Sequence, residues 1–145
     1  MEMTRVFKKT GFSLVELAVV VVIIGVLAAF AVPRFRSSVE RSKAAESFNY
    51  LSAVQAAQER YHARQSTYAD DLTNLDIQLT APKYFSIGTL SPGDTGDLQD
   101  SWTLTLTRSG ASAGYGEYTV TFTEEGFDSE NSTIIDHSDI NPMQT

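Results

Sequence analysis

Residues 12–32, FSLVELAVVVVIIGVLAAFAV, form an apolar run that contains one charged side chain, Glu16. A helix over these 21 residues would be about 31 Å long at 1.5 Å per residue, close to the roughly 30 Å hydrocarbon core of a bilayer. The run therefore predicts a membrane-spanning helix. A carboxylate at such a place costs about 3 kcal/mol on insertion scales, so Glu16 calls for a functional explanation.

The helical pattern continues beyond Pro33 to about Ala63. Apolar side chains recur at helical spacing on one side, and charged or polar ones lie on the other, which predicts an amphipathic half over residues 34–64. One helix of about 52 residues would be roughly 78 Å long. Because a helix of that length cannot be buried in so small a domain, we expect half of it to project and to find other partners. The apolar side comprises Ala44, Phe48, Tyr50, Leu51, Val54, Ala57 and Tyr61.

Later segments favour an antiparallel sheet. Ser101–Arg108 and Tyr118–Thr123 alternate apolar and polar residues across a glycine-rich connection, which predicts a hairpin, and Tyr84–Leu90 predicts a first strand. Asp70–Leu75 is expected to form a helical turn capped by Asp70 or Asp71. The apolar pair Ile134–Ile135 predicts either a further edge strand or a packed tail. The expected fold class is α+β: a long N-terminal helix packed on a sheet of three to four strands.

Charge is distributed unevenly along the chain. Residues 1–11 have a net charge of +2, residues 34–64 of +3 and residues 65–145 of −11. A basic stretch beside an apolar span and an acidic distal region are typical of a membrane-tethered protein whose head faces outward. The acidic head also argues against nucleic acid as its ligand.

The residue types needed for catalysis are absent or scattered in the sequence. There is no cysteine, so disulfides and thiolate metal sites are excluded. The two histidines, His62 and His137, have no metal-binding spacing, and no phosphate-binding loop or nucleophile motif occurs. We expect neither enzymatic activity, nor a cofactor, nor a metal site.

The segment KKTGFSLVELAVVVVIIGVLAAFAVP, from Lys8 to Pro33, closely resembles the class III signal of type IV pilins and type II secretion pseudopilins. In that family a short basic leader ends in glycine and is followed by phenylalanine and an apolar helix with glutamate as the fifth mature residue. An ordinary secretory signal is the alternative, with Ala29 and Ala31 as its cleavage motif. Its apolar region, however, is usually only 7–15 residues long.

The resemblance implies a pilin-like fold and a role for particular residues. Residues 1–11 would be a leader that prepilin peptidase removes after Gly11, and Phe12 would become an N-methylated N-terminus. Glu16 would pair with the Phe12 amine of a neighbouring subunit, which offsets the cost of burying either charge. Residues 12–33 would form the transmembrane and assembly half, in which Gly25 and Pro33 bracket a stretch able to lose helical order within a filament. Residues 65–145 would be the globular head.

The resemblance also implies a function and partners. We expect a structural subunit of a type IV pilus; a type II secretion pseudopilin, or a minor tip pilin for adhesion or DNA uptake, is the alternative. Its partners would be other pilin subunits, the prepilin peptidase, and an inner-membrane assembly platform with a cytoplasmic ATPase. The chain would lie in the inner membrane with its head outward, and then in an extracellular pilus or a periplasmic pseudopilus.

The lack of cysteine is a departure from many pilins, which close a C-terminal loop with a disulfide. The tail from Gly126 must therefore be held by packing or a bound ion, or stay mobile. Calcium binding in the acid-rich loops 94–100 and 124–130 is suggested by the family and by their oxygen ligands. No ordered ligand spacing is present, so we interpret these loops as a solvated acidic face.

Overall fold

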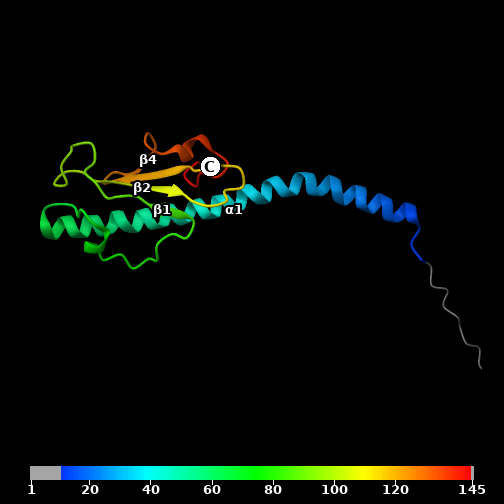
Figure 1. Cartoon of the computed structure of the whole chain (residues 1–145), viewed down its shortest axis with the longest axis horizontal. Coiled ribbons are helices and arrows are strands. Elements are labelled where there is room, and N and C mark those ends of the chain that lie inside the picture. The colour runs from blue at the N-terminus through cyan, green and yellow to red at the C-terminus, as the bar shows by residue number, and fades with distance from the viewer. Residues whose placement is uncertain (1–10, 145) are drawn as a thin grey trace, which may run out of the picture. The chain divides into compact units, whose positions relative to one another are not determined.

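The computed structural model describes residues 11–144, which form two compact units divided between Phe35 and Arg36 (Figure 1). One helix, α1 (Leu14–Gln65), contributes residues to both units and is 52 residues long. The prediction of a single long helix is confirmed. The helix begins two residues later than the start of the apolar run, because Ser13 acts as its N-cap, as described below.

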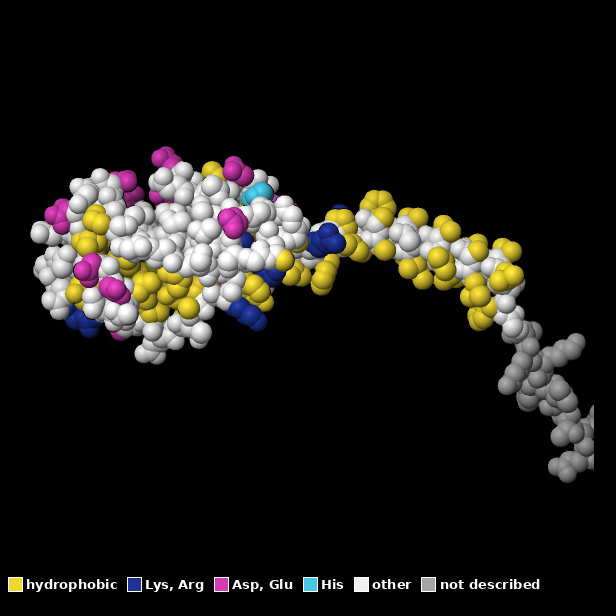
Figure 2. Space-filling view, in the orientation of Figure 1, with side chains coloured by type: hydrophobic (Ala, Val, Ile, Leu, Met, Phe, Trp, Pro, Cys, Tyr) yellow, Lys and Arg dark blue, Asp and Glu magenta, His cyan; other side chains and the backbone are white. Residues whose placement is uncertain are grey.

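In the first unit every residue of α1 is exposed. Hydrophobic side chains cover this part of the helix on all the sides that Figure 2 shows. By length and composition, α1 qualifies as a helix able to cross a membrane, and its most apolar window has no buried residue. An apolar surface of this extent is unfavourable in water by roughly 25 cal/mol per Å², so the unit requires lipid or other protein around it.

The second unit contains a four-stranded antiparallel sheet in the order β1-β2-β3-β4. The strands are β1 (Phe85–Ile87), β2 (Thr103–Arg108), β3 (Thr119–Thr123) and β4 (Gly126–Asp128). The predicted hairpin is confirmed as β2 and β3. The first strand is shorter than predicted, although the chain beyond it stays beside β2, with Ser91 in an isolated bridge to Thr103.

The fourth strand does not lie where the sequence suggested. An edge strand at Ile134–Ile135 is wrong, because Thr133–Asp136 forms a 3₁₀ helix, η2. The alternative of a packed tail is confirmed there, since Ile134 is fully buried. The actual edge strand, β4, follows β3 directly through a tight turn, and Gly126 has a φ of +107°, which a glycine adopts far more readily than other residues.

The core lies between α1 and the sheet, which Figure 1 shows along one side of the helix. Phe48 of α1 packs edge-on against Phe122 of β3, with ring centroids 5.8 Å apart. The amphipathic half of α1 therefore buries its apolar side against the sheet, as the pattern predicted. The fully buried core side chains include Ala44, Leu51, Val54, Ala57, Trp102, Leu104, Leu106, Val120, Ile134 and Ile140.

The chain that leaves α1 is fixed by its own hydrogen bonds. The Gln58 amide donates to the Ala69 carbonyl (3.1 Å) and accepts from the Ala69 N–H (2.8 Å). Asp71, one of the two predicted caps, accepts from Thr73 N–H and begins the short 3₁₀ helix η1 (Leu72–Asn74). These bonds hold the segment between α1 and β1 against the helix end.

The C-terminal tail is attached to β3 through hydroxyl groups. Ser132 Oγ accepts the Thr121 N–H (2.8 Å) and donates to the Asp128 carbonyl (2.5 Å). Thr133 Oγ1 accepts the Thr119 N–H (2.8 Å), and Thr119 Oγ1 accepts the Thr133 N–H (3.1 Å). Packing and hydrogen bonds therefore hold the tail of this cysteine-free chain.

Candidate functional site

The start of α1 is a reciprocal cap formed by Ser13 and Glu16. The Ser13 N–H donates to Glu16 Oε2 (2.8 Å), and the Glu16 N–H donates to Ser13 Oγ (3.2 Å). This is the capping box of a Ser-x-x-Glu sequence, and it satisfies two of the backbone donors that a helix leaves free at its N-terminus. A carboxylate in the first turn also interacts favourably with the positive end of the helix dipole. Glu16 thus has partners within its own chain.

Gly11 and Phe12 lie just before this cap. Both residues are outside the helix and exposed, and the Phe12 side chain is 83% exposed. A peptide bond inside a helix would have to be unwound before a protease could bind it, whereas the Gly11–Phe12 bond is accessible. Of the predicted basic leader, residues 1–11, all but Gly11 lie outside the described residues.

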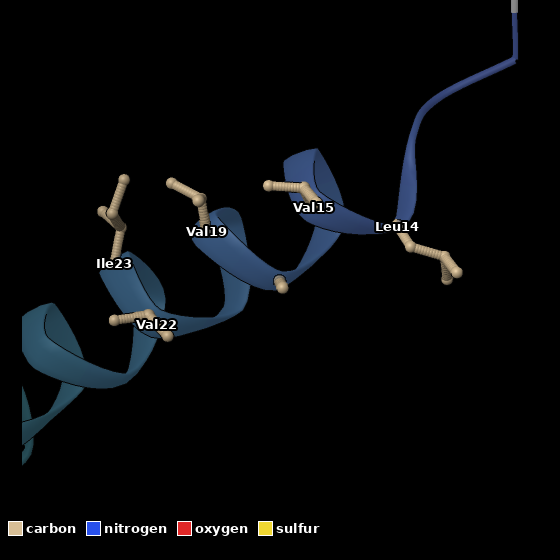
Figure 3. A pocket seen from close by; sticks show the side chains of 6 residues that line it. Leu14, Val15, Val19, Val22 and Ile23 are labelled. Atoms are coloured by element: carbon tan, nitrogen blue, oxygen red, sulfur yellow. The ribbon is translucent and has the colours of Figure 1, made fainter.

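The apolar surface that follows Glu16 has no partner within the described chain. Figure 3 shows Val15, Val19 and Ile23 on one side of the helix, spaced by one turn each. Together with Leu14 and Val22 they line a shallow, almost wholly apolar groove on the outside of α1. Such a surface suits hydrocarbon chains or the side chains of another helix.

Gly25 and Pro33 both lie inside the continuous helix α1. A Cβ atom at Gly25 would meet nothing within 4 Å. The stretch that they bracket is therefore helical in the single chain. Its predicted loss of helical order concerns the filament and stays a prediction.

A buried charge network that the sequence analysis missed ties α1 to the sheet. Arg108 Nε donates to Glu40 Oε1 (2.5 Å), Arg108 Nη2 donates to Glu40 Oε2 (3.2 Å), and the Tyr118 hydroxyl donates to Glu40 Oε1 (2.9 Å). The side chains of Glu40 and Arg108 are each 1% exposed. Burial alone would raise the pKa of Glu40, but the hydrogen bonds and charge of Arg108, with Tyr118 and Lys43, outweigh it and lower that pKa. Glu40 is therefore ionised at neutral pH.

The histidines and acidic loops serve as structural elements. His62 stacks on Tyr68, with ring centroids 4.4 Å apart, and His137 packs edge-on against Tyr115. In the loop after β4, Asp128 Oδ1 accepts two backbone N–H groups, those of Glu130 (3.0 Å) and Asn131 (3.1 Å). Within residues 11–144 there is no group of three or more Asp, Glu, His or Cys side chains placed to hold a metal ion.

Comparison with known proteins points to the N-terminal segment. Residues 7–32 match the family model described as the prokaryotic N-terminal methylation motif. The chain is 41% identical over 63 residues to the type IV major pilin protein PilA of Myxococcus xanthus, a match that covers 43% of this chain and 29% of PilA. It is 36% identical over 70 residues to the fimbrial protein EcpC of Eikenella corrodens, covering 48% and 46% of the two chains.

A third relative belongs to a secretion apparatus. The type II secretion system core protein G of Vibrio cholerae is 34% identical over 80 residues, which cover 55% of each chain. The chain thus spans 29–55% of the length of these three relatives. The matching motif, the pilin and pseudopilin relatives, and the long helix packed on an antiparallel sheet agree with one another. Over its N-terminal part this chain is therefore similar to type IV pilins and to a type II secretion system core protein.

Proposed function

We propose that the chain is a structural subunit of a type IV pilus and that it polymerises through α1 after cleavage between Gly11 and Phe12. The observation that carries this proposal is the exposed apolar surface of α1 with a single carboxylate at its beginning. Lipid can cover that surface in the monomer, and the helices of other subunits can cover it in a filament. A plain membrane anchor would use the same apolar length but has no need of Glu16.

Cleavage would create a positive charge that can pair with the Glu16 carboxylate. Removing residues 1–11 leaves a cationic α-amine on Phe12, one helical turn before Glu16. In a bundle of parallel helices shifted along their axes, the amine of one subunit can reach Glu16 of the next. Both charges are then paired in a dry environment, where an unpaired charge is most costly. N-methylation of Phe12 would keep the positive charge.

The charges on either side of the apolar span suggest the membrane topology, and the apolar surface of α1 suggests that assembly needs an external source of energy. Basic residues before the span and an acidic head after it favour a cytoplasmic leader and an outward head. Since lipid already removes the apolar side chains from water, transfer into a filament gains no hydrophobic free energy, and association relies on packing. We therefore include an inner-membrane assembly platform and a cytoplasmic ATPase among the partners.

A pseudopilin of a type II secretion system is the second candidate. It is favoured by the match to core protein G, which covers 55% of both chains. A minor pilin at a filament tip is less favoured for DNA uptake, because the head is strongly acidic and would repel a polyanion. Shearing separates the first two candidates: a major pilin should dominate the fibres sheared from the cell surface, and a pseudopilin should remain with the cell.

Processing can be tested at Gly11. Gly11→Leu should leave the leader attached, because a bulky side chain beside the scissile bond obstructs binding to the peptidase, and the protein should then migrate as a larger band on a gel. Gly25→Ala is the matched control, since a Cβ there has open space. Processing of the Gly11 variant at the normal rate would contradict cleavage at this bond.

Assembly can be tested at Glu16. Glu16→Ala should be processed normally but should lower the yield of sheared fibres several-fold, because the amine of the neighbour loses its partner. Glu16→Gln keeps the shape and most of the capping box while removing the charge, so a defect as large as that of alanine would indicate that charge is decisive. Normal fibre yield from both variants would remove the pairing role.

A further inference from the structure

The lysines of the chain gather at one place on the head. After cleavage at Gly11 the protein would contain two lysines, Lys43 and Lys83. Their Nζ atoms lie 4.9 Å and 5.7 Å from the ring centroid of Tyr84. The Arg108 guanidinium lies 5.6 Å from the same ring. Because Lys83 and Arg108 are the only basic residues among positions 65–145, positive charge in the acidic head is confined to this spot.

A surface groove runs beside these lysines along α1. One part is lined by Val39, Ser42, Lys43, Glu46 and Tyr84. A second part shares Ser42 and Glu46 with the first and extends along the helix to the loop before β1. That second part is lined further by Ala45, Asn49, Tyr50, Leu79 and Thr80. We call the two parts together the lysine groove.

The groove contains an unpaired buried acceptor and exposed apolar side chains, which are unfavourable on a surface that faces only water. Glu46 Oε1 accepts the Lys83 N–H (3.1 Å), whereas Glu46 Oε2 is buried and has no hydrogen-bond donor among the described residues. A buried acceptor without a donor is costly, by about 1–3 kcal/mol on average. Leu79 and Val39, toward the two ends of the groove, are 51% and 37% exposed. These features indicate a surface that is completed by another molecule.

We propose that the lysine groove is a contact between subunits, in which it receives an acidic loop from the head of a second copy of this chain. The proposal rests on the proposed filament, in which heads of identical chains meet. Charge complementarity argues for the second copy: residues 65–145 carry thirteen acidic side chains against two basic ones, and Figure 2 shows acidic side chains spread over the visible face of the head. Complementary charges at an interface fix its register and its specificity.

Lys43 already contacts the Glu40 carboxylate (3.4 Å), and an acidic loop would add groups to this contact. Its carboxylates can pair with Lys43 and Lys83, and a backbone N–H can donate to Glu46 Oε2. Exposed carboxylates are found in the loop before β2, at Asp94 and Asp100.

The small number of lysines makes a direct test possible. A carbodiimide activates a carboxylate, and a lysine amine then displaces the activating group to form an amide, so only groups already in contact are joined. In the mature chain the available amines are Lys43, Lys83 and the N-terminus. Sheared filaments assembled from a mixture of isotopically light and heavy subunits should yield mixed-isotope peptides that join Lys43 or Lys83 to an Asp or Glu of the head.

Variants make the result decisive. The double variant Lys43→Arg, Lys83→Arg keeps both charges and should form filaments at normal yield, but it should lose these cross-linked peptides. Lys83→Glu should lower filament yield several-fold, whereas Arg64→Glu, the same charge change at an exposed site near the end of α1, should not. Replacing the acidic residue identified by the cross-link with lysine should restore the filament yield of the Lys83→Glu variant.

The outcomes separate this proposal from the proposed function. Wild-type filaments that give no mixed-isotope peptide through either lysine, or normal assembly of Lys83→Glu, would overturn the contact while leaving the filament intact. Cross-links from the lysines to a different protein would also overturn it. A wild-type chain that forms no filament or pseudopilus would refute the proposed function, and this contact with it.

Discussion

Replacing Arg108 by methionine should destabilise the head more than any exposed substitution on it. The guanidinium makes a two-pronged ion pair with Glu40 and also donates to three backbone carbonyls, those of Tyr84 (3.1 Å), Ala111 (2.8 Å) and Ser109. It thus joins α1, the start of β1 and the loop after β2. Methionine is close to arginine in length and apolar, so the change removes the charge and the donors while filling much of the space.

The expected loss of stability depends on the Glu40 charge, which stays buried after Arg108 is removed. Breaking a buried ion pair by removing one partner typically costs 3–5 kcal/mol, because the other charge is left unpaired in the interior. Here Glu40 keeps the Tyr118 hydroxyl (2.9 Å) and Lys43 (3.4 Å), so we expect the lower end, about 3 kcal/mol. The double variant Glu40→Leu, Arg108→Met removes both charges and should be less destabilised than the sum of the single variants, by about 2 kcal/mol.

The fluorescence of Trp102 provides the assay. Trp102 is the only tryptophan in the chain and is fully buried in the head, so urea unfolding of the mature protein in detergent micelles should change its emission. With a slope of 1–3 kcal/mol per M, a loss of about 3 kcal/mol lowers the midpoint by roughly 1–3 M urea. The matched control is Arg60→Met.

Arg60 makes a similar two-pronged pair with Asp76 (2.9 Å for the closest contact), but these side chains are 50% and 51% exposed. Exposed pairs of this kind contribute little to stability, because water and salt screen them. The control should therefore barely move the midpoint. Equal midpoint shifts for the Arg108 and Arg60 variants would refute the argument that burial makes the Glu40 pair important.

Two further predictions concern the same unit. Because the pKa of Glu40 is lowered in the folded state, its contribution to stability is present above the ordinary pKa of about 4.5 and is lost as the pH falls through the folded value. Urea midpoints of the wild type should therefore fall more steeply below that pH than those of the Glu40→Leu, Arg108→Met variant, and parallel curves would contradict this. Ser132→Ala should cost about 1–3 kcal/mol, because Ser132 is 3% exposed and its hydroxyl accepts the Thr121 N–H; amide exchange at Thr121 should accelerate, while Ser129→Ala, at an exposed position, should leave it unchanged.

The parts of the fold that the sequence predicts are those with a local pattern. The alternation of Trp102, Leu104 and Leu106 marks β2 without reference to the rest of the chain, and all three side chains are fully buried. By contrast, β4 has three residues, Gly126–Asp128, and none of them is buried. Its pairing depends on the backbone turn at Gly126, so no alternation in the sequence could reveal it.

The buried pair of Glu40 and Arg108 could not be predicted from the sequence for a different reason. Arg108 occupies the inward position of β2 after Leu104 and Leu106, and Glu40 lies one turn before Ala44 on the buried side of α1. Extending the periodicity to these two positions would place both on the buried side, but the sequence analysis assigned neither of them to a face. Only the docking of α1 on the sheet shows that the two charges meet. Lys43 and Lys83 were missed for the same reason, since forty positions of sequence separate them.

The N-terminal site was easier to predict, because its residues lie close together in the sequence. Gly11, Phe12 and Glu16 form a linear motif, and the match to the methylation motif over residues 7–32 agrees with it. The capping box was missed, although its Ser-x-x-Glu signature is visible in the sequence at Ser13 and Glu16. The sequence analysis gave Glu16 a partner in a neighbouring subunit, the Phe12 amine, whereas within the single chain the Ser13 N–H donates to its carboxylate.

Each half of α1 contains a glutamate, buried at Glu40 and exposed at Glu16 in the single chain, and the difference between them implies an order of events. Glu40 is neutralised by Arg108 within the same chain, so this buried pair is complete before any subunit meets another. Among residues 11–144, Glu16 has only backbone and hydroxyl partners, and we propose that its counter-ion comes from a neighbouring subunit. The head can therefore fold in the membrane-bound monomer. The charge pairing of the apolar half is completed only when subunits polymerise. Arg108→Met should accordingly lower the amount of monomer in the membrane, whereas Glu16→Ala should leave monomer abundant and fibres scarce. Immunoblots of membrane and sheared fractions would distinguish the two, and a Glu16 variant that depletes the monomer would contradict this order.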